Sequence, residues 1–179
     1  LLQQGRTADA LELFRMQYPE MPVFSLALYL IKDKQWSAAY PLLRSMAAPS
    51  GANAPWYALA LAAGALEGGD IRAVETSAKA LLALDPPQES HTVSIPAADA
   101  GAGQLQLSRS LYLSMLSEYL GKLLDQQNVA LIPELLASRQ LQGIPALQAA
   151  KMLSEAGFSL AVGDSAQAAV PLWQRVITL

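Results

Sequence analysis

The sequence contains no cysteine and a single histidine, and only 15% of its 179 residues are charged. Without cysteine there are no disulfides, no thiolate nucleophiles and no Cys-ligated zinc, and the redox compartment stays open. With one histidine, the common metal-ligand sets are missing except those made of carboxylates alone. Because the acidic residues are scattered, we expect no metal and no cofactor.

Positive charge and long apolar runs are also scarce. The chain has 12 Lys and Arg against 15 Asp and Glu, a formal net charge of −3. A nucleic-acid-binding surface needs clustered Lys and Arg, so we expect no nucleic-acid partner. The longest apolar run, residues 54–66, is shorter than the roughly 20 residues that a spanning helix needs. We therefore expect no membrane insertion by this chain.

Catalytic motifs are missing as well. His91 lies next to Glu89 and Ser90 in a stretch without periodicity, and we interpret it as a solvated loop histidine rather than a general base. The glycines of residues 101–103 have no strand before them and no Gly-Lys-Ser/Thr after them, so a phosphate loop is not indicated. No G-x-S-x-G pattern occurs. These observations predict a protein that is not an enzyme.

The residues that are abundant favour helices. The chain is 53% hydrophobic with Ala and Leu dominating, and both residues lose little on entering a helix. Periodicity and Gly or Pro stop signals predict helices over residues 7–18, 23–32, 38–46, 55–66, 71–84, 105–126, 128–140, 146–162 and from 166 onward. Thr7 is the expected N-cap of the first helix. Turns are expected at 68–70, 143–145 and 163–165.

Residues 88–104 differ from the rest of the chain. They are rich in Ser, Pro, Asp and Gly and show no helical period. We predict an irregular insertion or linker here, between the third and fourth helix pairs.

Two patterns in the helical segments recur at intervals near 34 residues. The first consists of Gly69, Asp70, Leu84, Asp85 and Pro86, with a weaker copy at Ala10, Phe14 and Pro22. The second places Pro41, Pro133 and Pro171 near the first turn of a second helix, where a missing N–H matters least. When the repeats are aligned on these prolines, Gly157 lies at the position of the first helix where a small residue is needed for packing. These patterns resemble the tetratricopeptide repeat family in a degenerate form, and Val74 and Leu81 depart from its usual small residues.

The resemblance implies an all-α fold, an α-α superhelix in which about five antiparallel helix pairs form a right-handed solenoid over residues 1–179. A helical bundle or another α-solenoid is the alternative. The uncapped apolar ends lead us to expect a fragment of a longer protein. The compartment is left open between bacterial cytoplasm and periplasm, with absent flanking segments as a potential membrane tether.

The resemblance also implies a concave groove lined by the first helices of the pairs. Its positions here are apolar and suit another protein or an apolar or amphipathic peptide. The members are Met21, Phe24, Leu28, Ile31, Trp56, Leu59, Ala63 and Leu66. The alternative is that these residues are core, covered by residues 88–104 or by a neighbouring pair. Family members that clamp a peptide carboxylate use Lys, Asn and Arg at these positions, so that activity is not expected.

The function that these observations favour is a non-catalytic scaffold for protein–protein interaction. By family-level analogy it would be a component or assembly factor of a bacterial envelope, secretion or polysaccharide-export complex. The alternative is a helical accessory domain of a larger enzyme whose catalytic part lies outside this chain. Self-association through the groove is a further hypothesis.

Overall fold

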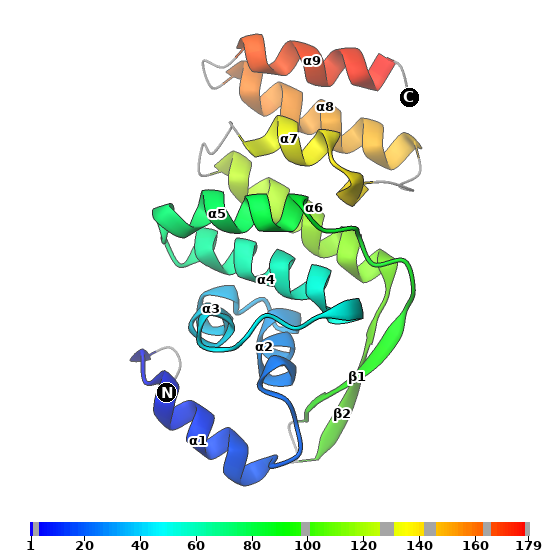
Figure 1. Ribbon diagram of the computed structural model, residues 1–179. Helices are drawn as coiled ribbons and strands as arrows, with labels where there is room; N and C mark the ends of the chain where they lie inside the picture. The colour runs from blue at the N-terminus through cyan, green and yellow to red at the C-terminus, as the bar shows by residue number, and fades with distance from the viewer. Residues whose placement is uncertain (2–3, 98–100, 126–130, 142–145, 163–165, 178–179) are drawn as a thin grey trace.

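The computed structural model describes residues 1, 4–97, 101–125, 131–141, 146–162 and 166–177. In this part of the chain the protein is mostly helical and carries one small antiparallel sheet. The helices are stacked in an elongated column with the two termini at opposite ends (Figure 1). The mainly helical character predicted from the sequence is confirmed, whereas the sheet was not expected.

The helix boundaries follow the Gly and Pro signals closely. The helices are α1 (Thr7–Gln17), α2 (Val23–Lys32), α3 (Trp36–Ser45), α4 (Ala54–Glu67), α5 (Ile71–Leu82), α6 (Arg109–Asp125), α7 (Leu131–Ala137), α8 (Ala146–Val162) and α9 (Ala166–Ile177), with short 3-10 turns η2 (Gly51–Asn53) and η3 (Arg139–Leu141). Thr7 is the first helical residue and not the N-cap, which is Arg6 without a side-chain capping bond. The turns expected at 143–145 and 163–165, and the helix start expected at 128, lie outside the described residues.

The turn between α4 and α5 shows how local chemistry folds one helix back on the other. Gly69 has a φ of +70°, a conformation that glycine adopts without strain. Asp70 then caps α5, because its Oδ1 accepts a hydrogen bond from Ala73 N at 3.2 Å. Its Oδ2 accepts from Tyr40 Oη at 2.9 Å and from Arg44 Nη1 at 3.1 Å. The Tyr40 hydrogen bond, more than any other interaction, holds the pKa of Asp70 below its ordinary value.

The helices stack in a regular order around one continuous core. Neighbours in sequence pack together, as α4 does with α5 and α8 with α9, and helices two apart also touch: α4 with α6, α5 with α7, α6 with α8 and α7 with α9. Glycine permits two of the closest approaches. A Cβ on Gly64 would lie 2.9 Å from Tyr40 Cβ, and one on Gly157 would lie 2.4 Å from Trp173 Nε1. Gly157 therefore occupies a small packing position, as the sequence pattern predicted.

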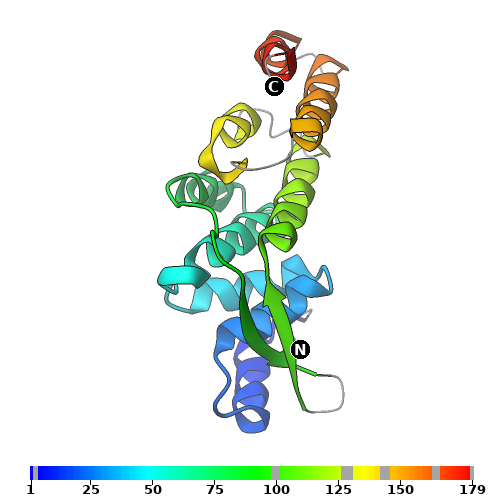
Figure 2. The ribbon, with the colours of Figure 1, turned by 90° about the vertical axis from the view of Figure 1, so that its right-hand side faces the viewer.

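Residues 91–107 form a β-hairpin, which corrects two predictions. The segment 88–104 is not irregular throughout, and the helix expected from residue 105 begins at Arg109 because residues 105–107 belong to the second strand. Strand β1 (His91–Pro96) pairs antiparallel with β2 (Ala102–Leu107), with Val93 opposite Leu105. Polar and apolar residues alternate along both strands, so one face of the hairpin buries apolar side chains while the other meets water. The hairpin lies lengthwise along the column, from the level of α6 down to α1, and β1 packs on α2 (Figure 2).

The buried side chain of Gln140 connects the end of α5 to α6. Gln140 is fully buried, and its Nε2 donates to the carbonyl oxygens of Leu81 at 2.8 Å and Leu84 at 2.6 Å, at the end of α5. Its Oε1 accepts from Tyr112 Oη at 2.6 Å, and its main-chain oxygen accepts from Arg109 Nη2 at 2.8 Å. Gln140 thus satisfies open helix-end carbonyls of α5 and joins them to α6.

Candidate functional site: an apolar cleft beside the hairpin

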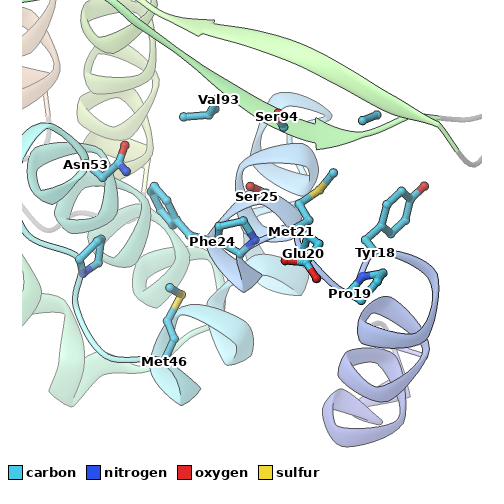
Figure 3. A pocket seen from close by; sticks show the side chains of 13 residues that line it. Tyr18, Pro19, Glu20, Met21, Phe24, Ser25, Met46, Asn53, Val93 and Ser94 are labelled. Carbon is cyan, nitrogen blue, oxygen red and sulfur yellow. The ribbon is translucent and has the colours of Figure 1, made fainter.

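An apolar concave site lies where the turn between α1 and α2 faces the hairpin. It is a cleft of about 570 Å³, within the range of known ligand sites. Figure 3 shows the side chains that surround it, which come from the α1–α2 turn, α2, the segment after α3, and the two strands. They are predominantly apolar: Tyr18, Pro19, Glu20, Met21, Pro22, Phe24, Ser25, Met46, Pro49, Asn53, Val93, Ser94 and Ala102.

Prolines make one wall of the cleft stiff. Pro19 follows the end of α1, and Pro22 sits at the N-cap of α2 with an extended backbone, φ −61° and ψ 145°. Fixed φ angles limit the motion of this turn. The ring of Tyr18 packs against that of Phe14, 5.5 Å between centroids, which holds the turn to α1. The two prolines and the Phe14–Tyr18 ring contact therefore restrict the conformation of this wall.

The opposite wall is β1, and side chains hold it at both ends. At its start His91 Nε2 lies 2.8 Å from Asn53 Oδ1. Just past its end Tyr18 Oη donates to Ala97 O at 3.4 Å, a weak hydrogen bond across 79 positions of sequence. The interpretation of His91 as a solvated loop residue is wrong, because it is partly buried on a strand and its Nδ1 is buried without a partner among the described residues.

The floor of the cleft belongs to the protein core. Phe24 is buried and its ring packs at 6.3 Å from that of Tyr57, whose hydroxyl donates to Leu43 O at 2.9 Å. Burial raises the pKa of Tyr57. Ser25, 5% exposed, adds a hydroxyl to the floor. Met21 is half-buried, so its thioether stays available to a bound molecule.

The cleft has few polar groups. Glu20 is its one charged lining residue and has no ion pair within the described part of the chain. The described residues contain no group of three or more His, Asp or Glu that could hold a metal. Nor does any described helix combine the length and apolarity needed to span a bilayer. What the cleft offers is apolar contact, one carboxylate and a few hydrogen-bonding groups.

The structure places most of the groove residues predicted from the sequence in the core. Except for Met21, none is more than 5% exposed: Phe24, Leu28, Ile31, Trp56, Leu59, Ala63 and Leu66. Only Met21 and Phe24 reach the cleft. The open groove over α2 and α4 is therefore absent, and the alternative assignment of these residues to the core describes the structure.

Two elements cover the predicted groove. The hairpin and the start of α6 lie over α2, so that Leu28 and Ile31 share a small cavity of about 130 Å³ with Leu105 and Leu107. Helix α6 covers α4, where Trp56 meets Tyr112 edge to face at 5.3 Å. Beside Met21, by contrast, the hairpin leaves the larger apolar cleft open.

The cleft residues missed from the sequence come mostly from connecting segments. The sequence pattern gives Tyr18 and Pro19 as the end of the first helix and Pro22 as part of the repeat pattern, and it assigns no role to Asn53. Val93 could have been found, since Thr92 to Ile95 alternates polar and apolar residues as a half-buried strand does.

Comparisons with protein-family models, with curated proteins and with solved structures give no match for this chain.

Proposed function

We propose that this protein is a non-catalytic scaffold that binds an apolar or amphipathic segment of another protein in the cleft between the α1–α2 turn and β1. The observation that supports this most strongly is the cleft itself, a stiff-walled apolar cavity of about 570 Å³. Apolar lining with few polar groups is typical of sites that bind by surface burial. Met21 at its rim and Phe24 at its floor supply the contact area.

The fold supports the same proposal. Helices two apart in sequence touch along the column, the arrangement by which repeated helix pairs bury a common core. We propose on this basis, and on the repeat pattern, a degenerate tetratricopeptide-like solenoid of about five pairs. A role in a bacterial envelope, secretion or polysaccharide-export assembly is a hypothesis that rests on the family resemblance alone.

A selection experiment tests the proposal. Peptides displayed on phage are selected against the protein, and their affinities are then measured for the Met21→Asp and Met16→Asp variants. Both residues are methionines near the end of α1, but Met16 is 73% exposed and outside the cleft. We expect Met21→Asp to weaken binding about tenfold or more, because burial of a methionine is worth about 1.5–3 kcal/mol. Met16→Asp should leave the affinity unchanged.

Selected peptides that bind Met21→Asp as tightly as the parent protein would contradict the proposal. Circular dichroism and the melting temperature of each variant establish that it is folded. Light scattering on the same samples tests self-association, since a mass that stays monomeric at all concentrations would exclude it.

A further inference from the structure

The strand register shows which main-chain groups of the hairpin have no partner in the sheet. Ala97 N donates to Gly101 O at 3.0 Å. In an antiparallel ladder, hydrogen-bonded and non-hydrogen-bonded pairs alternate. Given the register Pro96 with Ala102 and Ser94 with Gln104, those two pairs are of the non-hydrogen-bonded kind. The main-chain groups of Thr92, Ser94 and Pro96 therefore point away from β2.

Of these three residues, Ser94 lines the cleft. The sheet has only two strands, and within the described residues no main-chain partner is found for Thr92 or Ser94 outside it. Val93 and Ser94 line the cleft on the hairpin side, across from the α1–α2 turn and α2 (Figure 3). The Asn53–His91 and Tyr18–Ala97 contacts hold this edge at both ends. A free strand edge thus borders an apolar floor.

We propose that the occupant of the cleft is an extended peptide segment of another protein that pairs with the outer edge of β1 as a third strand. This inference rests on the proposed function and names the conformation of the partner. A segment of about five or six residues would match β1, with every second side chain directed to the floor of Met21, Phe24 and Met46. A helical peptide pairs its main-chain groups internally except at its two ends, so it cannot form a ladder with this edge.

The negative charge of Glu20 at the cleft indicates which charged residue the bound segment would carry. The Glu20 carboxylate lines the cleft without an ion pair in the described part of the chain. Glu20 is exposed at the edge of the cleft, so a Lys or Arg of the segment beside it would form a solvent-accessible ion pair with it. The occupant is thus an apolar strand-forming sequence with one basic residue.

Two proline variants test the pairing on the protein side, with a peptide selected for Met21-dependent binding as the probe. Ser94→Pro removes the N–H that faces the cleft, and Gln104→Pro removes the corresponding N–H at the other edge of the hairpin. Neither N–H bonds to the other strand, and both variants lose the hydrogen bond from Gln104 Nε2 to Ser94 Oγ. We expect Ser94→Pro to weaken peptide binding roughly five- to tenfold, the effect of one hydrogen bond, and Gln104→Pro to bind normally. Equal affinity of the two variants would overturn the pairing.

N-methylation of the peptide, one amide at a time, tests the same pairing without altering the protein. In a paired strand only alternate amides face the neighbouring strand, so we expect loss of affinity at every second position. Uniform tolerance of N-methylation by a Met21-dependent peptide would refute strand pairing while leaving the proposed function intact. If no Met21-dependent peptide is recovered, the proposed function itself fails and this inference with it.

A charge variant tests the basic residue. Glu20→Gln should weaken binding of a Lys-containing peptide about two- to threefold at low salt, whereas Glu12→Gln, on the exposed surface of α1, should not. An unchanged affinity for Glu20→Gln would remove the basic residue from the proposal.

Discussion

Replacement of Gly64 by alanine should destabilise the protein, although alanine is the better helix former. Gly64 lies buried in α4, where α3 crosses it closely. A Cβ there would lie 2.9 Å from Tyr40 Cβ and 3.3 Å from the main-chain oxygen of Trp36. Both neighbouring atoms are part of, or directly attached to, the backbone of α3. The clash can be relieved only if the two helices move apart.

The magnitude follows from two opposing effects. Alanine in place of glycine stabilises a helix interior by about 0.5–1 kcal/mol. An extra methyl in a well-packed interface costs about 1–3 kcal/mol. We therefore expect Gly64→Ala to lower the free energy of unfolding by about 1–2 kcal/mol, which corresponds to a melting temperature lower by roughly 2–8 °C for a chain of this size.

Gly121 in α6 is the matched control, because a Cβ there has no atom within 4 Å. Only the helix-propensity gain applies, so Gly121→Ala should raise the free energy of unfolding by about 0.5–1 kcal/mol. Urea unfolding followed by circular dichroism measures both variants. A Gly64→Ala protein as stable as the parent, or a destabilised Gly121→Ala protein, would refute the packing described for α3, α4 and α6.

Two further variants test polar contacts that organise the column. Gln140→Leu leaves the Tyr112 hydroxyl and the Leu84 carbonyl without their hydrogen-bond partner. Each buried unsatisfied group costs about 1–3 kcal/mol, so we expect urea unfolding to show a free energy of unfolding lower by about 2–4 kcal/mol. A decrease below about 0.5 kcal/mol would contradict the role given to Gln140. The pKa of Asp70 is lowered in the folded state, so its contribution to stability is present above the ordinary carboxyl pKa and disappears as the pH falls through the folded value. The melting temperature of Asp70→Asn should therefore lie below that of the parent at pH 7 and approach it toward pH 3, whereas a difference independent of pH would show that the charge of Asp70 does not matter.

The helices could be predicted from the sequence because their boundaries are encoded locally. Pro22 and Gly69 stand at or next to helix ends, and the apolar residues between such signals follow the helical period. The hairpin was not predicted because residues 88–104 lack a helical period and have the Ser, Pro, Asp and Gly content of a loop. The alternation of apolar residues at Val93 and Ile95, and at Leu105 and Leu107, is the signal that identifies it.

The site was harder to predict because its walls meet through contacts far apart in sequence. Tyr18 reaches Ala97 across 79 positions, and His91 reaches Asn53 across 38. Apolar residues on α2 and α4 indicate faces to be covered, but the sequence does not say which face the hairpin and α6 occupy. Burial of Leu28 and Trp56 is decided by that covering, and so is the exposure of Met21.

The methionine methyl groups provide the most direct test of binding in the cleft. The chain has five methionines, of which Met21 and Met46 line the cleft, Met16 is exposed on α1 and Met115 is buried in α6. With ¹³C-methyl-labelled protein, titration of a selected peptide should shift the Met21 and Met46 resonances and leave those of Met16 and Met115 in place. Binding that shifts Met16 alone, or that leaves Met21 and Met46 unmoved, would contradict the assignment of the cleft as the partner-binding site.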